Sequence, residues 1–126
     1  MFECKKILNG RGNVPEPEVH TAGILVSAGQ ALTLTGGSLV ATGDAAAPTH
    51  IALADAAANT KVACYAVLPG MIFDVPVSAL PTGVAEGAKL KLATDGLSVT
   101  ATSGGAATVV NLNGATKAGD IIQVKF

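Results

Sequence analysis

The sequence predicts an all-β protein, a small β-barrel or β-sandwich with an extended N-terminal arm and at most short helical turns. A strand–turn–strand phrase occurs twice, at residues 29–40 (GQALTLTGGSLV) and 87–99 (GAKLKLATDGLSV). Its leucines alternate with Thr or Lys, which is typical of half-buried strands. Aromatic residues make up only 3% of the chain. Small aliphatic side chains pack in thin layers, and these suit a narrow barrel or sandwich.

Ten segments have the apolar alternation or the short apolar run of a strand. They are residues 23–26, 31–35, 38–41, 50–53, 62–68, 72–77, 89–93, 98–102, 108–112 and 121–126. Glycine adopts positive φ at little cost, so Gly36-Gly37, Asp95-Gly96 and Gly104-Gly105 predict tight turns. Residues 45–48 and 55–59 are long enough for one short helical turn each, and no longer helix is expected.

Residues 1–22 differ from the rest and are predicted to form an extended N-terminal arm. Pro15 and Pro17 fix φ and favour extended conformations at Val14 and Glu16, so this segment is neither helical nor a central strand. A disordered tail is the alternative. The length of 126 residues is that of one domain, so residues 23–126 are predicted to form a single β domain.

The order of elements is similar in the two halves of this predicted domain. Besides the repeated phrase, residues 49–55 (THIALAD) resemble 108–114 (TVVNLNG), and residues 70–77 (GMIFDVPV) resemble 119–126 (GDIIQVKF). A duplicated fold would explain this order. Phrases of this kind are also common in unrelated β proteins, so both explanations stay open.

The composition indicates a surface that is covered by other chains. Charged residues make up 13% of the chain, and the mean hydropathy is +0.49. Neutral polar side chains could supply the surface instead. Low charge and high apolar content mark obligate interfaces, so a homo-oligomer or another permanent contact is the favoured interpretation.

Charge and segment length exclude several classes of partner. The net charge of −1 does not supply the basic field that nucleic-acid binding needs. No window is long and apolar enough for a membrane span, and no apolar segment follows the first lysines as in a signal peptide. Two distant cysteines without a secretion signal are expected to be free thiols. Folding in a reducing cytoplasm is therefore expected.

The residues that could carry chemistry are dispersed along the chain. His20, His50, Cys4 and Cys64 show neither ligand spacing for a metal nor a cysteine pair motif. His50 is interpreted as a hydrogen-bonded structural histidine, and Cys64 as a small buried side chain. The prediction is that the protein is not an enzyme and has no catalytic residues, metal site or cofactor.

Four segments together resemble the small head decoration (cement) proteins of tailed bacteriophages. They are residues 13–18 (NVPEPE), 29–34 (GQALTL), 48–52 (PTHIA) and 68–77 (LPGMIFDVPV). The resemblance implies a β-rich structural virion protein, often trimeric, that binds the major capsid protein on the outside of the expanded head and clamps neighbouring capsomers. It also implies that an extended N-terminal segment makes part of this contact.

On this interpretation residues 2–19 contact the capsid, and their deletion should leave a folded domain that no longer binds heads. Phe2 and Val14 would be apolar anchors. The other predicted contact residues are Lys5, Lys6, Arg11, Pro15, Glu16, Pro17 and Glu18. An extended arm can add a strand to a neighbour's sheet, and many weak contacts on a lattice add up to a stable shell.

Three other functions remain as alternatives. The first is a receptor- or carbohydrate-binding module, which would need an exposed aromatic platform such as Tyr65. The second is a self-assembling structural subunit. The third is a small hydrolase that uses Cys64 with His50, for which the sequence supplies no activating element near the thiol.

Overall fold

The computed structural model describes residues 1–7 and 16–126, and of residues 5–7 it describes the backbone alone. These residues form eleven strands and no helix. The strands are β1 (Glu3–Ile7), β2 (Glu18–Ala22), β3 (Ala31–Thr35), β4 (Ser38–Ala41), β5 (His50–Ala52), β6 (Lys61–Ala66), β7 (Met71–Pro76), β8 (Lys89–Leu92), β9 (Val99–Ser103), β10 (Ala107–Asn111) and β11 (Ile121–Lys125). Within the described chain no helix could cross a membrane.

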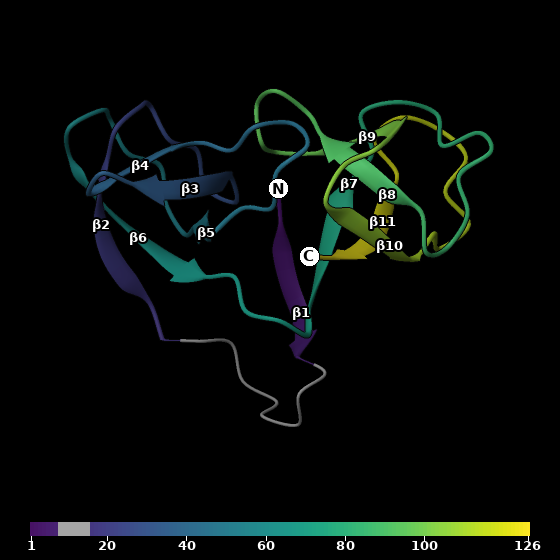
Figure 1. Cartoon of the computed structure of the whole chain (residues 1–126), viewed down its shortest axis with the longest axis horizontal. Helices are drawn as coiled ribbons and strands as arrows, with labels where there is room; N and C mark the ends of the chain where they lie inside the picture. The colour runs from purple at the N-terminus through teal and green to yellow at the C-terminus, as the bar shows by residue number, and fades with distance from the viewer. Residues whose placement is uncertain (8–15) are drawn as a thin grey trace.

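The strands form two sheets that lie side by side, and β1 runs between them (Figure 1). The first half of the chain forms a closed barrel in the order β2-β4-β3-β5-β6. The second half, together with β1, forms a six-stranded sheet in the order β1-β7-β11-β10-β8-β9. The predicted all-β class with a small barrel is confirmed. The predicted strand at residues 23–26 is wrong, because only Val26 makes a bridge there, to Ala56.

Both ends of the predicted N-terminal arm belong to the folded body. Strand β1 pairs antiparallel with β7, with Cys4 opposite Phe73. Strand β2 pairs with β6 and β4 in the barrel. Residue 22 is therefore no boundary between an arm and a domain, because strand pairing takes up residues on both sides of the predicted arm. Residues 8–15, which form its middle, lie outside the described residues.

The two halves repeat the same strand pairing. In the first half β2 pairs parallel with β4, and the remaining contacts β4-β3, β3-β5, β5-β6 and β6-β2 are antiparallel. In the second half β7 meets β9 through the parallel bridge between Val77 and Val99. The contacts β9-β8, β8-β10, β10-β11 and β11-β7 are again antiparallel. Strand β1 is an addition to β7 that the first half does not share among the described residues.

Backbone hydrogen bonds outside the strands show which residues of the two halves are structurally equivalent. The N–H of Gly23 donates to Leu39 as that of Ser78 donates to Val99, both at 2.8 Å. Residues 70–77 therefore correspond to β2, and residues 119–126 correspond to β6. The similarity between 70–77 and 119–126 in the sequence is thus not the structural repeat, because these two segments are neighbouring strands of one sheet. The similarity of residues 49–55 to the second half also needs a shift. The hydrogen bonds make Ala52 equivalent to Val109, which lies two residues before the position that the sequence similarity assigns to Ala52.

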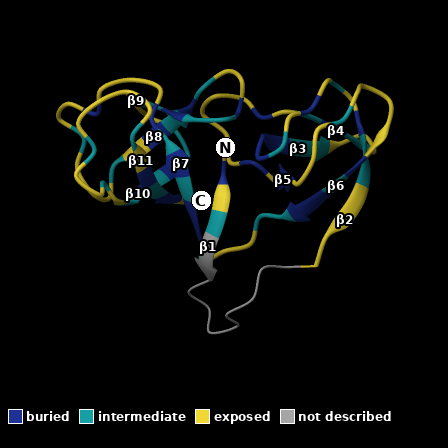
Figure 2. Cartoon of the chain, turned by 180° about the vertical axis from the view of Figure 1, so that it is seen from behind, coloured by how far each residue is buried: buried dark blue, intermediate teal, exposed yellow. Residues whose placement is uncertain are grey.

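Two cores hold the molecule together. The small barrel core lies inside the first half and comprises Ala22, Val26, Leu32, Leu39, Ala52, Val62 and Cys64. The larger core fills the second half and also contains Ala31, Ile51 and Tyr65, which neighbour one another across β3, β5 and β6. These three strands are therefore buried on both faces, one toward each core. Figure 2 shows the buried strands and the exposed connections around them.

The few aromatic residues gather in the larger core. Phe2 packs edge-on against Phe73 with ring centroids 6.0 Å apart, and Phe126 lies 5.7 Å from Phe2. Tyr65 stacks on Phe73 at 6.5 Å. Tyr65 is only 4% exposed, so it offers no platform for a sugar ring.

Ionisation of the Tyr65 phenol is expected to lower the stability of the fold at high pH. Burial raises the pKa of its phenol from 10.0 to about 12, and its hydrogen bond with the Cys4 backbone opposes this rise. Between these two values the unfolded chain loses the Tyr65 proton while the folded chain keeps it. The free energy of unfolding should therefore fall by roughly 1.4 kcal/mol per pH unit from this group. Urea unfolding at pH 9, 10 and 11 measures this slope.

The matched variant for this prediction is Tyr65→Phe. It removes the titrating group and keeps the ring in the core. Its stability should decline less steeply above pH 10 than that of the unmodified chain. Equal slopes for the two chains would show that Tyr65 ionises as easily in the folded chain as in the unfolded one.

Candidate functional site

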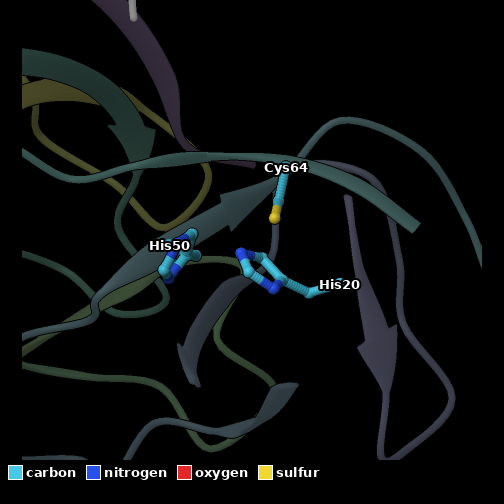
Figure 3. A group of neighbouring side chains, drawn as sticks. All are labelled: His20, His50 and Cys64. Carbon is cyan, nitrogen blue, oxygen red and sulfur yellow. The ribbon is translucent and has the colours of Figure 1, made fainter. Parts of the chain in front are cut away.

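Four side chains with metal-ligating or acid–base chemistry meet at one end of the barrel. They are Glu18 and His20 of β2, His50 of β5 and Cys64 of β6. Figure 3 shows the two imidazoles and the thiol directed toward one another. Their ligating atoms, one each from His20, His50 and Cys64, lie within 4.8 Å of one another.

Strand alternation brings these residues to the inner face of the barrel. In β2, Glu18 and His20 share a face with the buried Ala22, while Val19 points outward and is 62% exposed. In β6, Cys64 lies opposite Glu18. Strand β5 is buried on both faces, so His50 points inward while its neighbour Ile51 enters the larger core.

The carboxylate of Glu18 links the two imidazoles. Its Oε1 accepts hydrogen bonds from Nε2 of His20 at 2.8 Å and from Nε2 of His50 at 3.2 Å. The other ring nitrogen of His50, Nδ1, lies 2.9 Å from the hydroxyl of Thr49. This hydroxyl also accepts the backbone N–H of Leu34 at 2.8 Å. The orientation of His50 is therefore held from both sides of the ring.

The electrostatics of the cluster keep the thiol protonated and the carboxyl ionised. Hydrogen bonds from His20, and then from His50, lower the pKa of the Glu18 carboxyl. Burial, with a smaller effect of the Glu18 charge, raises the pKa of Cys64 from 9.0 to about 11. The Cys64 thiol also points to the backbone carbonyl of Glu18 at 3.7 Å. A buried thiol with a raised pKa is a poor nucleophile, so this geometry gives no support to a Cys64–His50 hydrolase.

Apart from Phe2, the predicted capsid-contact residues fall into three groups. Glu16, Pro17 and Glu18 are exposed, although Glu18 is also bound to the two histidines. Lys5 and Lys6 belong to β1, where the structure describes the backbone alone. Arg11, Val14 and Pro15 lie outside the described residues.

Among the predicted contact residues whose side chains the structure describes, Phe2 is the one whose position contradicts its predicted role. It is 2% exposed and lies in the larger core. The prediction that it anchors a partner is wrong for the chain in this fold, because its ring is already covered by Phe73 and Phe126.

A second feature of functional interest is an uncharged stretch of sequence in the barrel half. No Asp, Glu, Lys or Arg occurs between Val19 and Gly43. Within this stretch the exposed large apolar residues are Val19 and Leu25, and Leu25 is 75% exposed. The structural repeat places Leu80 at the position of Leu25 in the second half, and Leu80 is also exposed, at 54%. Figure 2 shows the exposed part of β2 on this side of the barrel.

A groove of about 370 Å³ separates β1 from the barrel. Its lining includes Met1 and Leu53, which are both exposed, and the buried Tyr65. The walls are mostly apolar, and Glu3 and Cys4 of β1 also line the groove.

No family model matches the sequence, and no curated protein matches it significantly.

The cluster does not follow from the sequence when residues 1–22 are interpreted as an arm, because Glu18 and His20 then lie outside the β domain. The signal was present in β2, where Glu18 and His20 are two residues apart and therefore share one face of a strand. The proximity of His50 and Cys64 to this pair could not be read from their spacing, since it depends on the closure of the barrel.

Proposed function

We propose that this protein is a structural protein that covers the surface of a neighbouring protein, and that it is a head decoration protein of a tailed bacteriophage. The observation that carries the proposal is the uncharged stretch from Val19 to Gly43 with its exposed Val19 and Leu25. Exposed apolar side chains in a stretch without charged residues suit a protein–protein contact, whose core is depleted in charge. The resemblance of four sequence segments to cement proteins supports the choice of a capsid as the partner.

In this proposal the compact β body makes the main contact with the major capsid protein, and exposed residues Glu16 and Pro17 lie beside it. The chain clamps neighbouring capsomers on the outside of the expanded head. Before it meets a head it is a small homo-oligomer, with a trimer favoured by the resemblance. Light scattering after size exclusion measures that state, and a large open assembly would favour the self-assembling alternative instead.

Co-sedimentation with expanded phage heads that lack their decoration protein tests the function. The unmodified chain should pellet with the heads, and Leu25→Asp should reduce the bound fraction at least about tenfold, since a buried charge at an interface costs more than 1.4 kcal/mol. The matched control is Thr82→Asp, which adds the same charge to an exposed loop of the second half. It should bind as the unmodified chain does.

Two outcomes would contradict this proposal. Failure of the unmodified chain to pellet with any expanded head would remove the capsid as the partner. Equal binding by Leu25→Asp, Val19→Asp and Thr82→Asp would leave the capsid as the partner and reject the barrel surface as the contact.

A further inference from the structure

We propose that Glu18, His20, His50 and Cys64 form a zinc site that ties together β2, β5 and β6 at the end of the barrel. This inference is independent of the proposed capsid function. It rests on the identity of the four side chains, on their distances, and on a comparison with the second half of the same chain.

The donor set fits zinc. Two imidazole nitrogens, one thiolate sulfur and one carboxylate oxygen are ligands that zinc binds in a tetrahedral site. With zinc bonds of about 2.0–2.3 Å, neighbouring ligand atoms lie about 3.3–3.7 Å apart. The 3.2 Å between Oε1 of Glu18 and Nε2 of His50 is already close to this spacing. The ligating atoms of His20, His50 and Cys64 lie within 4.8 Å of one another. Glu18 contacts the two histidines but lies outside this group, so its carboxylate must turn toward Cys64 to complete the site.

Side chains around the cluster support the ligands in the way metal sites require. The hydroxyl of Thr49 lies beside Nδ1 of His50 at 2.9 Å, so it can accept that ring proton while Nε2 binds the metal. Cys64 is fully buried, and His50 nearly so. Glu18 lies at the exposed end and leaves a route for the ion from solvent. The Cys64 thiol loses its proton to solvent when zinc binds.

The second half of the chain provides an internal comparison. Glu18 of β2 lies opposite Cys64 of β6, and in the equivalent pair of strands Phe73 of β7 lies opposite Val124 of β11. His50 lies opposite Leu32 as Ala107 lies opposite Leu90. The residues equivalent to Glu18, His20, His50 and Cys64 are Phe73, Val75, Ala107 and Val124, and all of these are buried hydrophobic residues.

The fold itself therefore does not require polar groups at these four positions. One half fills them with hydrocarbon, whereas the other gathers every kind of side chain that zinc prefers. Burying polar groups costs free energy that an apolar replacement avoids. A bound metal supplies the reason why the barrel half keeps them.

Zinc fits better than copper. A copper site with two histidines and one cysteine has a weak, distant axial ligand. Here the fourth group is a carboxylate that already contacts both imidazoles. A carboxylate oxygen is an ordinary ligand of zinc in a four-coordinate site.

Calorimetric titration of the reduced, metal-free chain with zinc chloride tests the proposal. The unmodified chain should bind one zinc ion. The variants His20→Val and Cys64→Val each introduce the residue that the second half has at the equivalent position. Each should weaken zinc binding by more than about 100-fold. That is more than the loss expected when a residue that only supports a ligand is replaced. The matched control is Cys4→Ser, which changes the other cysteine of the chain and should bind zinc as the unmodified chain does.

Cobalt(II) provides a second measurement that needs no variant. Cobalt in the site should give a thiolate-to-metal charge-transfer band in the near ultraviolet and strong visible bands of tetrahedral coordination. The charge-transfer band should persist in Cys4→Ser. Zinc should also raise the thermal unfolding midpoint of the unmodified chain and of Cys4→Ser.

The results that overturn the proposal are specific. Failure of the unmodified chain to bind zinc, or a cobalt complex without a thiolate band, would mean that the four side chains are only a hydrogen-bonded network. Zinc binding of equal strength in Cys64→Val would place the ion elsewhere. An intense copper(II)–thiolate band in a chain that does not bind zinc would assign the site to copper.

Discussion

Replacement of Phe2 by alanine is expected to lower the free energy of unfolding by about 3–5 kcal/mol, the usual cost of removing a buried phenylalanine ring. The ring is 2% exposed and packs against Phe73 and Phe126 in the larger core. The backbone of Phe2 also bonds to Gly29 at 2.9 Å, so the residue joins β1 to the barrel half. Chemical denaturation followed by circular dichroism measures the loss.

Two controls separate core packing from a general sensitivity to substitution. Phe2→Leu keeps most of the buried volume and should cost less than about 1.5 kcal/mol. Leu25→Ala changes an exposed side chain and should alter stability by less than about 0.5 kcal/mol. An unfolding midpoint for Phe2→Ala equal to that of the unmodified chain would show that the first residues do not pack on this core.

The burial of Phe2 also changes what a truncation is expected to do. The sequence alone predicts that the chain without residues 1–19 stays folded. The structure predicts instead that this deletion removes β1, the Phe2 ring and the beginning of β2. A truncated chain is therefore a poor test of capsid binding, and the point substitutions on the barrel surface are the better test.

Replacement of Gly105 by alanine is expected to lower the free energy of unfolding by about 3 kcal/mol or more, at the upper end of the range for overpacking. Strand β8 lies between β9 and β10, so the short connection from β9 to β10 must cross it. A Cβ atom at Gly105 would lie 2.0 Å from the carbonyl oxygen of Leu90. The clash is with backbone, which can move only if the contacts between β8 and β10 give way.

Gly43→Ala is the matched control for this substitution. Gly43 lies in the corresponding connection of the first half, between β4 and β5, where the connection is longer. A Cβ atom there would meet only the Cβ of Ala46, at 4.0 Å. Its effect should be within about 0.5 kcal/mol. Similar denaturation midpoints for the two alanine variants would contradict the close crossing at Gly105.

The sequence predicted most of the strands because their pattern is local. Leu32 and Leu34, and likewise Leu90 and Leu92, alternate with polar residues, and each pair lies in a strand as expected. Gly36-Gly37 connects β3 to β4 as predicted, and both glycines have positive φ. Such signals depend on the nearest neighbours in the chain and need no knowledge of the fold.

The N-terminal segment was misjudged because its partners are remote. Pro15 and Pro17 correctly exclude a helix, but they do not reveal that β1 pairs with β7 or that β2 closes the barrel. Phe2 was interpreted as an exposed anchor because nothing near it in sequence shows the Phe73 ring that covers it. Pairing between distant strands decides both cases.

The repeat illustrates the same limit. Similar phrases at residues 70–77 and 119–126 reflect two neighbouring strands with similar burial, whereas the equivalent strands are β2 with β7 and β6 with β11. Only the hydrogen-bond registers show whether two similar segments are neighbouring strands of one sheet or equivalent strands of the two halves. Apolar alternation alone is the same in both.

By itself, the sequence determined the all-β class, the positions of most strands and turns, and a low-charge composition suited to covering another surface. The tertiary structure decided that the N-terminal residues complete both sheets, and that Glu18, His20, His50 and Cys64 meet at one end of the barrel. The physical reason is that alternation and turn chemistry act between neighbours in the chain. Barrel closure brings together side chains from three separate strands, and no local pattern encodes that.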